Sequence, residues 1–153
     1  MVDLDQIREN LNSRKYTMIG SGSGRLVFDL KNGYVAKVAK NKKGLAQNKA
    51  EYKIEAMSDC DMFAKITAIS EDCKVLIMQK AEQIKSIAVI WKYYNVKSNH
   101  ELFRQSVFDD FGTKYRLLYG DLCRKSSWGI INNKPVIIDY GFTKDTRKYY
   151  TFI

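Results

Sequence analysis

The sequence predicts an α+β fold in which an antiparallel sheet of about five strands comes first, and helices with a small β-hairpin follow. Three observations predict it. Short alternating or β-branched apolar segments dominate the first half of the 153-residue chain. One helical pattern interrupts these segments, and two more helical patterns follow them. A last pair of short apolar segments near the end then predicts the hairpin.

The first half begins with Leu4, Ile7 and Leu11, whose spacing of three and four residues predicts a short amphipathic helix over residues 3–14. Asn32-Gly33 favours a tight hairpin turn, and Glu71-Asp72 is expected to turn a second hairpin. Strands are expected at residues 16–20, 25–31, 34–39, 63–70 and 74–79, and a helix at about 45–57 after a basic connector.

The second half is expected to contain helices at about residues 82–93 and 99–111, with Gly112 ending the second. A short strand over residues 116–119 should lead into a polar loop over 120–127. Residues 128–131 and 136–138 should then pair around Asn132-Asn133-Lys134.

The tail, residues 143–153, is basic and aromatic and predicts no regular element. Two interpretations stay open for Arg147-Lys148-Tyr149-Tyr150 and Phe152. Their rings could stack on nucleic-acid bases, or they could pack on the domain as its last core segment.

The composition narrows the class of protein. There are 26 Lys and Arg residues against 17 Asp and Glu, a formal net charge of +9, which favours acidic partners such as nucleotides, nucleic acid or an acidic protein. The lysines are scattered, so they also suit a merely soluble surface. Three cysteines and a single histidine, His100, cannot build a zinc site of the usual kind.

Compartment signals point to the cytoplasm. The free thiols expected of Cys60, Cys73 and Cys123 favour a reducing environment. Residues 1–12 contain no signal-peptide core, and the longest apolar run, residues 87–91, is too short to span a bilayer. We therefore expect a cytoplasmic protein with no membrane partner.

A glycine-rich segment lies between the first two expected strands. Glycines let a backbone approach a ligand closely and point amide groups at phosphate oxygens, although a glycine-rich hairpin turn without any ligand is about as common. The segment precedes no helix and lacks a Gly-Lys-Ser/Thr ending, so it is neither a dinucleotide fingerprint nor a P-loop. It consists of Ile19, Gly20, Ser21, Gly22, Ser23 and Gly24.

Four charged residues could carry chemistry. Lys37 lies in a β-branched strand, and Glu51 in the following helix could pair with it, although both could simply face solvent. Asp121 opens a polar loop, where a carboxylate can accept a proton from an attacking hydroxyl. Asp139 ends an apolar strand beside Tyr140-Gly141, where a carboxylate can bind a hard metal ion. Each aspartate is also a common turn residue.

Taken in order over residues 16–143, these pieces resemble the protein-kinase-like superfamily. The segment Gly20 to Gly24 resembles its glycine-rich loop, with the third glycine one position early. Val35-Ala36-Lys37 is similar to its lysine strand, and Glu51 to its ion-pair glutamate. Tyr119-Gly120-Asp121-Leu122 resembles a catalytic loop of the His-Gly-Asp form, and Asp139-Tyr140-Gly141 resembles the Asp-Phe-Gly motif.

The resemblance implies a minimal protein-kinase-like fold. It implies one domain over residues 1–153, with an N-lobe over about 1–79 and a reduced helical C-lobe over about 82–153. Val38-Ala39-Lys40-Asn41, Gly44 to Asn48 and Trp128-Gly129 further resemble small kinase-like proteins of bacteria and phages.

The resemblance also implies ATP and Mg²⁺ as cofactors, with a role for each site residue. Lys37, held by Glu51, would grip the phosphates, Asp121 would orient the acceptor hydroxyl, and Lys125 would lie near the transferring phosphate. Asp139, with Ser126, would bind the metal. The remaining nucleotide contacts would come from residues 19–24, Met78 and Lys80.

Two departures from the family pattern leave two functions open. Kinases place a metal-binding asparagine about five residues after the catalytic aspartate, where this chain has Arg124-Lys125-Ser126-Ser127. The chain also stops shortly after Gly141 without an activation segment, so an acceptor would have to bind differently.

One function is a phosphotransferase to a Ser/Thr or small-molecule hydroxyl. The other is a pseudokinase that binds or regulates a partner, for example an inhibitory protein of a phage or mobile element. The joint presence of Lys37, Glu51, Asp121 and Asp139 favours nucleotide binding.

Overall fold

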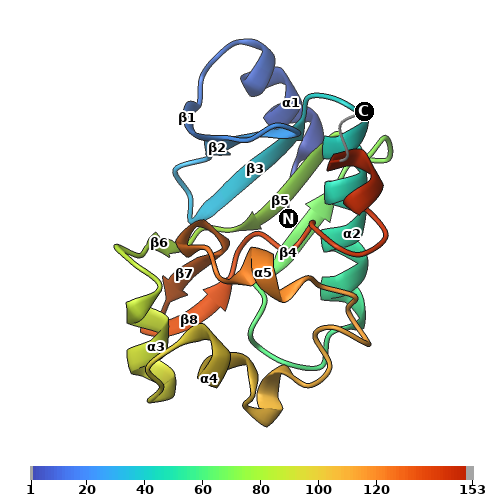
Figure 1. Ribbon diagram of the computed structural model, residues 1–153. Coiled ribbons are helices and arrows are strands. Elements are labelled where there is room, and N and C mark those ends of the chain that lie inside the picture. The colour runs from blue at the N-terminus through green and yellow to red at the C-terminus, as the bar shows by residue number, and fades with distance from the viewer. Residues whose placement is uncertain (1, 151–153) are drawn as a thin grey trace.

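The computed structural model describes residues 2–150. The chain forms two layers of structure, one above the other in Figure 1. The upper layer is a five-stranded antiparallel sheet in the order β1-β2-β3-β5-β4. It is built from α1 (Leu4–Asn12), β1 (Thr17–Ser21), β2 (Arg25–Asp29), β3 (Tyr34–Ala39), α2 (Lys42–Met57), β4 (Ile66–Ile69) and β5 (Val75–Gln79).

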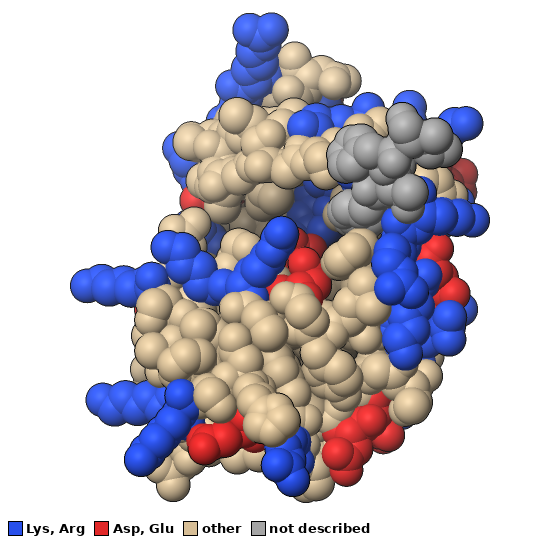
Figure 2. Space-filling view, in the orientation of Figure 1, with Lys and Arg blue, Asp and Glu red and all other residues tan. Residues whose placement is uncertain are grey.

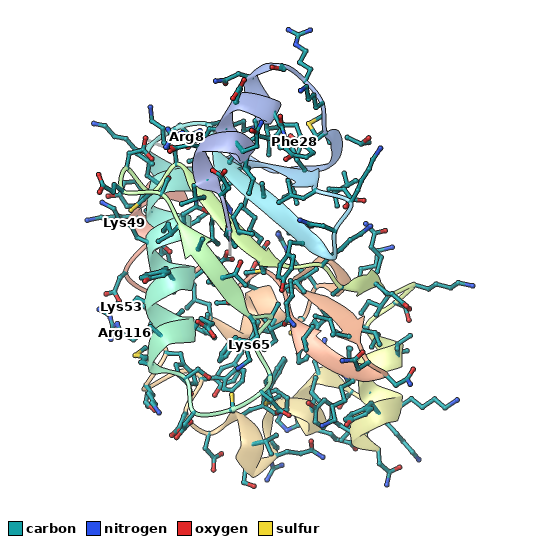
Figure 3. All side chains as sticks on the ribbon, turned by 180° about the vertical axis from the view of Figure 1, so that it is seen from behind. Arg8, Phe28, Lys49, Lys53, Lys65 and Arg116 are labelled. Carbon is teal, nitrogen blue, oxygen red and sulfur yellow. The ribbon has the colours of Figure 1, made fainter. Side chains whose placement is uncertain are left out.

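The alternation of β3 gives the sheet two different faces. Ala36 belongs to an apolar cluster with Val75 and Ile77, which the amphipathic helix α1 covers through Leu4, Ile7 and Leu11. Phe28 lies beside α1 on this outer side (Figure 3). Val35 and Lys37 point to the opposite face, toward the second layer, because side chains alternate along a strand.

The second layer is a small three-stranded sheet in the order β6-β7-β8, surrounded by short helices. Its elements are β6 (Glu82–Gln83), α3 (Ala88–Tyr94), α4 (Asn99–Phe103), the 3₁₀ turn η1 (Ser106–Phe108), α5 (Tyr119–Leu122), η2 (Lys125–Ser127), β7 (Trp128–Ile131), β8 (Lys134–Ile137) and η3 (Arg147–Tyr150).

Two expected helices are shorter than predicted. Residues 82–83 form a strand instead of helix, because Gln83 pairs with Gly129 of β7, and α3 begins only at Ala88. A side chain at position 129 would lie 2.5 Å from the Cβ of Ala81, so glycine permits this close approach. The helix expected over 99–111 ends at Phe103 and is followed by a 3₁₀ turn.

The prediction of a strand over residues 116–119 is also wrong. Leu117 forms only an isolated bridge with Thr143. Arg116 has a φ of 56°, a left-handed conformation that breaks an extended run. Tyr119 instead starts α5, and its hydroxyl donates a hydrogen bond to the carbonyl of Phe108 at 2.6 Å.

One apolar cluster joins the two layers. It includes Leu76 and Met78 of the upper sheet together with Phe108 and Trp128 of the lower layer. Phe63 lies at the junction, with its ring centroid 5.4 Å from that of Phe111 and 4.8 Å from that of Tyr140. The two layers are therefore parts of a single packed body.

The first part of the tail packs on the domain. Thr143 and Thr146 are buried and hydrogen-bond to each other, and η3 lies against α2. Tyr149 is 39% exposed, and Phe152 lies outside the described residues. Residues 2–150 include no helix with the length and apolar character needed to cross a bilayer.

Candidate functional site

A cleft of about 710 Å³ separates the two layers. It is hollowed on the face seen in Figure 2, where acidic atoms lie at the centre with basic atoms around them. Of the residues singled out from the sequence, only Glu51 is not in its lining, because it lies behind Lys37. The others line it together: Ile19, Gly20, Ser21, Gly22, Ser23, Gly24, Lys37, Met78, Lys80, Asp121, Lys125, Ser126 and Asp139.

The cleft has an apolar part and a charged part. Sheet residues such as Val27 and Val35 face Ile84, Trp128 and Ile138 of the lower layer across the apolar part. The charged part is lined by Arg25, Lys37, Asp121, Arg124, Lys125 and Asp139. Such a cleft suits a ligand with a flat apolar group at one end and anionic groups at the other.

Lys37 and Glu51 form a buried ion pair. The Nζ atom of Lys37 lies 2.9 Å and 3.1 Å from the two carboxylate oxygens of Glu51, and it also donates to the carbonyl oxygen of Ile138 at 2.5 Å. Glu51 in turn accepts a hydrogen bond from the backbone N–H of Tyr140 at 2.9 Å. One carboxylate therefore joins β3, α2 and the segment after β8.

One polar face of α2 is buried against the sheet. Asn48 and Glu51 are completely buried. The Asn48 amide donates to the carbonyls of Lys37 and Cys73, at 3.3 Å and 2.8 Å. Lys49 and Lys53 lie on the other side of α2 and point away from the sheet (Figure 3). The helix thus buries Asn48 and Glu51 against the sheet and leaves Lys49 and Lys53 exposed.

Arg25, which sequence reasoning missed, lies at the centre of the charged part. Its guanidinium makes a two-pronged contact with Glu51, at 2.7 Å and 3.0 Å, and a third hydrogen bond to Asn48 Oδ1 at 3.0 Å. It also contacts Asp139 Oδ1 at 3.2 Å. The signal was available: residue 25 is where the third glycine of the kinase pattern would stand.

The two cations control the ionisation of Glu51. Burial alone would raise the pKa of Glu51, but the charges of Arg25 and Lys37 hold it at about 2. Burial lowers the pKa of Lys37, against the opposing attraction of Glu51. Glu51 is therefore a permanent anion between two cations.

Asp121 has the opposite environment. Its side chain is only 12% exposed, and the nearest guanidinium atom, Arg124 Nη1, is 3.9 Å away. Burial, followed by the negative charge of Asp139, raises the pKa of Asp121 to about 6. A carboxylate that ionises near neutrality is suited to proton exchange with a bound hydroxyl.

Asp121 lies in the single turn α5, not at the end of a strand as predicted. Its backbone carbonyl accepts a hydrogen bond from Ser127 Oγ at 2.9 Å, which holds the following loop in place. Ser127 is buried and committed to this contact, whereas Ser126 is exposed and lines the cleft.

Asp139 fits a magnesium ligand. Its side chain is 44% exposed and lines the cleft. Mg²⁺ is commonly held by one or two carboxylates together with substrate phosphates and water. Within residues 2–150, no three or more acidic, histidine or cysteine side chains are grouped so that they could hold a metal ion by themselves.

The glycine-rich loop is a tight turn anchored to α2. The Gly22 N–H donates to the Arg25 carbonyl at 2.9 Å and closes the turn. The Ser23 carbonyl accepts from Asn41 Nδ2 at 2.9 Å, and the Gly24 carbonyl accepts from the Lys40 N–H at 2.8 Å. The loop therefore has a defined position above the charged part of the cleft.

A comparison with solved structures supports the fold. The solved structure of the streptomycin–ATP–APH(2")-IIa ternary complex superposes with a TM-score of 0.51 at 16% identity, covering 92% of this chain and 73% of that chain. The chain has a protein-kinase-like fold. At this identity the likeness concerns the fold alone.

The gentamicin complex of APH(2")-IIa gives a TM-score of 0.48 at 16% identity, covering 92% of this chain and 71% of that chain. No protein-family model matches the chain. No curated protein sequence matches it either.

Proposed function

We propose that this kinase-like chain binds ATP with Mg²⁺ and transfers the terminal phosphoryl group to a hydroxyl of a small molecule or of a Ser/Thr side chain. The observation that carries the proposal is the buried Lys37–Glu51 pair at the charged end of a cleft whose other end is apolar. In this proposal the two layers are the two lobes of one domain, and the nucleotide lies between them.

The adenine would lie in the apolar part, between Val27 on the sheet and Ile138 below it. The phosphates would meet Lys37, whose ammonium is aimed by Glu51 and by the Ile138 carbonyl. The loop of residues 19–24 would cover the phosphates and exclude water. Pre-placed charges of this kind stabilise a transferring phosphoryl group without reorganisation.

Asp121 would hold the acceptor hydroxyl and take its proton. The acceptor oxygen forms a bond to the terminal phosphorus while the bond from that phosphorus to the bridging oxygen breaks, and ADP leaves with the bond's electron pair. Asp139, with Ser126 beside it, would hold Mg²⁺, which supplies charge neutralisation at the phosphates. Lys125 would add positive charge at the rim.

The acceptor is proposed to be neutral or anionic. The ternary complex that superposes on this chain holds streptomycin, a cationic aminoglycoside. A polycation needs carboxylates to bind it, and Asp121 and Asp139 are the only acidic residues among those that line this cleft. Five basic residues line it as well: Arg25, Lys37, Lys80, Arg124 and Lys125.

The first test is a thermal shift with ATP and Mg²⁺. A nucleotide at a hundredfold excess over its dissociation constant stabilises the folded state by about 2.7 kcal/mol, so the wild type should show a clear rise in melting temperature. Lys37→Ala should lose most of it, and Asp139→Ala should lose the part that depends on Mg²⁺. Lys65→Ala and Asp61→Ala, which remove the same charges from exposed positions outside the cleft, should keep it.

A second candidate function is a pseudokinase that binds a partner without chemistry. The presence of Ser126 in place of the family's asparagine favours it. A wild-type protein with no shift at saturating ATP would support this candidate over the first. A shift without any phosphoryl transfer to a panel of neutral and anionic hydroxyl compounds would support a nucleotide-dependent regulator.

A further inference from the structure

Arg25 occupies a place where the family pattern has glycine. Its side chain leaves the start of β2, is only 7% exposed, and ends between Glu51 and Asp139. A glycine at this position would leave Lys37 as the only cation in contact with Glu51. The arginine therefore adds a second, buried positive charge to the wall of the cleft.

The contacts of Arg25 are unequal. Glu51 accepts hydrogen bonds from both Nη atoms of Arg25, at 2.7 Å and 3.0 Å, and its side chain is completely buried. Asp139 takes a single, longer contact at 3.2 Å, and its side chain is 44% exposed. Paired N–H donors on one carboxylate hold a guanidinium strongly in place. Arg25 is thus the stationary partner, and Asp139 is the one free to turn toward a ligand.

The charges at the site balance because Arg25 is present. Arg25 and Lys37 together offset Glu51 and Asp139 within one chain of contacts. With an uncharged residue at position 25, the same group would carry one net negative charge beside the place of the phosphates. Such a site would depend on a metal ion to neutralise it.

We infer that Arg25 is a built-in cation that competes with Mg²⁺ for Asp139 and presents positive charge to the nucleotide phosphates, so that nucleotide binding depends only weakly on Mg²⁺. This inference rests on the proposed nucleotide site. It also accounts for position 126, where a serine replaces the asparagine that binds a second metal in kinases.

The experiment compares the dissociation constant of ATP, measured by titration calorimetry, in excess Mg²⁺ and in EDTA. For the wild-type chain we expect the two constants to differ by about tenfold or less, equivalent to about 1.4 kcal/mol. Arg25→Gln should widen this ratio by a further factor of about ten, mainly by weakening binding in EDTA. Arg25→Lys, which keeps the charge, should stay close to the wild-type ratio.

Arg8→Gln is the matched control, because Arg8 lies on α1 (Figure 3), makes a two-pronged contact with the exposed Asp72 and does not line the cleft. The ratio of its ATP dissociation constants in EDTA and in excess Mg²⁺ should equal that of the wild type.

A wild-type ratio above about a hundredfold overturns the inference even if Arg25→Gln does not fold. Equal ratios for the wild type and Arg25→Gln also overturn it. An absence of ATP binding under both conditions overturns the proposed nucleotide site, and the inference with it.

Discussion

At the scale of single residues, the site shows how partners decide the state of a buried carboxylate. Glu51 is more deeply buried than Asp121, yet its pKa is about 2 whereas that of Asp121 is about 6. Glu51 touches two cations, while Asp121 faces the negative charge of Asp139 and has its nearest guanidinium at 3.9 Å. Burial penalises both anions, and only at Glu51 do neighbouring cations outweigh that penalty. Glu51 therefore stays ionised at neutral pH, whereas Asp121 changes its protonation state near pH 6.

Asp121→Asn should raise the stability of the folded protein while it removes the proposed phosphoryl-transfer activity. The folded-state pKa of about 6 lies above the ordinary value of 3.8, so the folded protein binds this proton more tightly than the unfolded chain. The stability contributed by Asp121 is thus present below about pH 4 and is lost as the pH rises through about 6. At pH values above about 6, removing the charge should therefore stabilise the folded state by about 1 kcal/mol. The melting temperature should then rise by about 2–4 °C.

The same variant should retain ATP binding and lose phosphoryl transfer. Thermal unfolding on both sides of the pKa, together with a transfer assay, measures both effects. If the variant instead had a lower melting temperature than the wild type at pH values above this pKa, the folded state would stabilise the Asp121 carboxylate. Transfer at the wild-type rate would remove Asp121 from the proposed chemistry.

At the scale of elements, α2 is the helix that contacts the site both above and below the cleft. Along one face it presents Gly44 to the glycine-rich loop, Asn48 to Arg25, and Glu51 to Lys37. Gly141 packs against the backbone of the same helix, where a side chain would lie 2.9 Å from the Cβ and the carbonyl oxygen of Gln47. The helix therefore positions both the loop above the cleft and the Asp139-Tyr140-Gly141 segment below it.

Gly44→Ala tests the close contact between α2 and the glycine-rich loop. Alanine normally stabilises a helix interior relative to glycine by up to about 1 kcal/mol. Here the added Cβ would overlap the carbonyl oxygen of Gly24 and lie 2.9 Å from the Cα of Ala39. We expect a loss of about 1–3 kcal/mol in unfolding free energy, as for other overpacked sites, and weaker ATP binding because the loop is displaced.

Gly120→Ala in α5 is the control, since a Cβ there meets nothing within 4 Å. Chemical denaturation of both variants gives the comparison. A Gly44→Ala protein as stable as the wild type, or more stable, would mean that the loop and α2 are not in close contact.

At the scale of the whole molecule, the two layers share one core. Met78 of the sheet and Trp128 of the lower hairpin belong to the same cluster, and Phe63 joins them through its contacts with Phe111 and Tyr140. A backbone hydrogen bond from the Ile137 N–H to the Met62 carbonyl, 2.7 Å long, also crosses between the layers. Neither layer can lose its packing without exposing apolar surface of the other.

We therefore expect the layers to unfold together. The two tryptophans, Trp91 and Trp128, both report on the lower layer, whereas amide exchange at Ala36 and Ile77 reports on the upper sheet. Both probes should give the same midpoint and the same unfolding free energy, as expected for a two-state transition. Exchange in the sheet at a much lower free energy than the tryptophan transition would show two separately folding units.

The sequence by itself determined the elements that depend on near neighbours. The strand expected over 34–39 matches β3, and the last hairpin turns at Asn132-Asn133. Its second strand begins at Lys134, two residues earlier than predicted. Lys37, Glu51, Asp121 and Asp139 could all be named, because their order along the chain matches a known pattern. The fold brings Lys37, Asp121 and Asp139 to one cleft and pairs Glu51 with Lys37.

Tertiary structure decided the rest. Residues 82–83 became a strand because β7 lies beside them, and the expected strand at 116–119 was replaced by a bridge and a helical turn. Arg25 gained its place in the site from contacts with Glu51 and Asp139, which are 26 and 114 residues away. Local propensity acts over a few residues, whereas the partners that give a buried charge its role are brought together only when the layers pack.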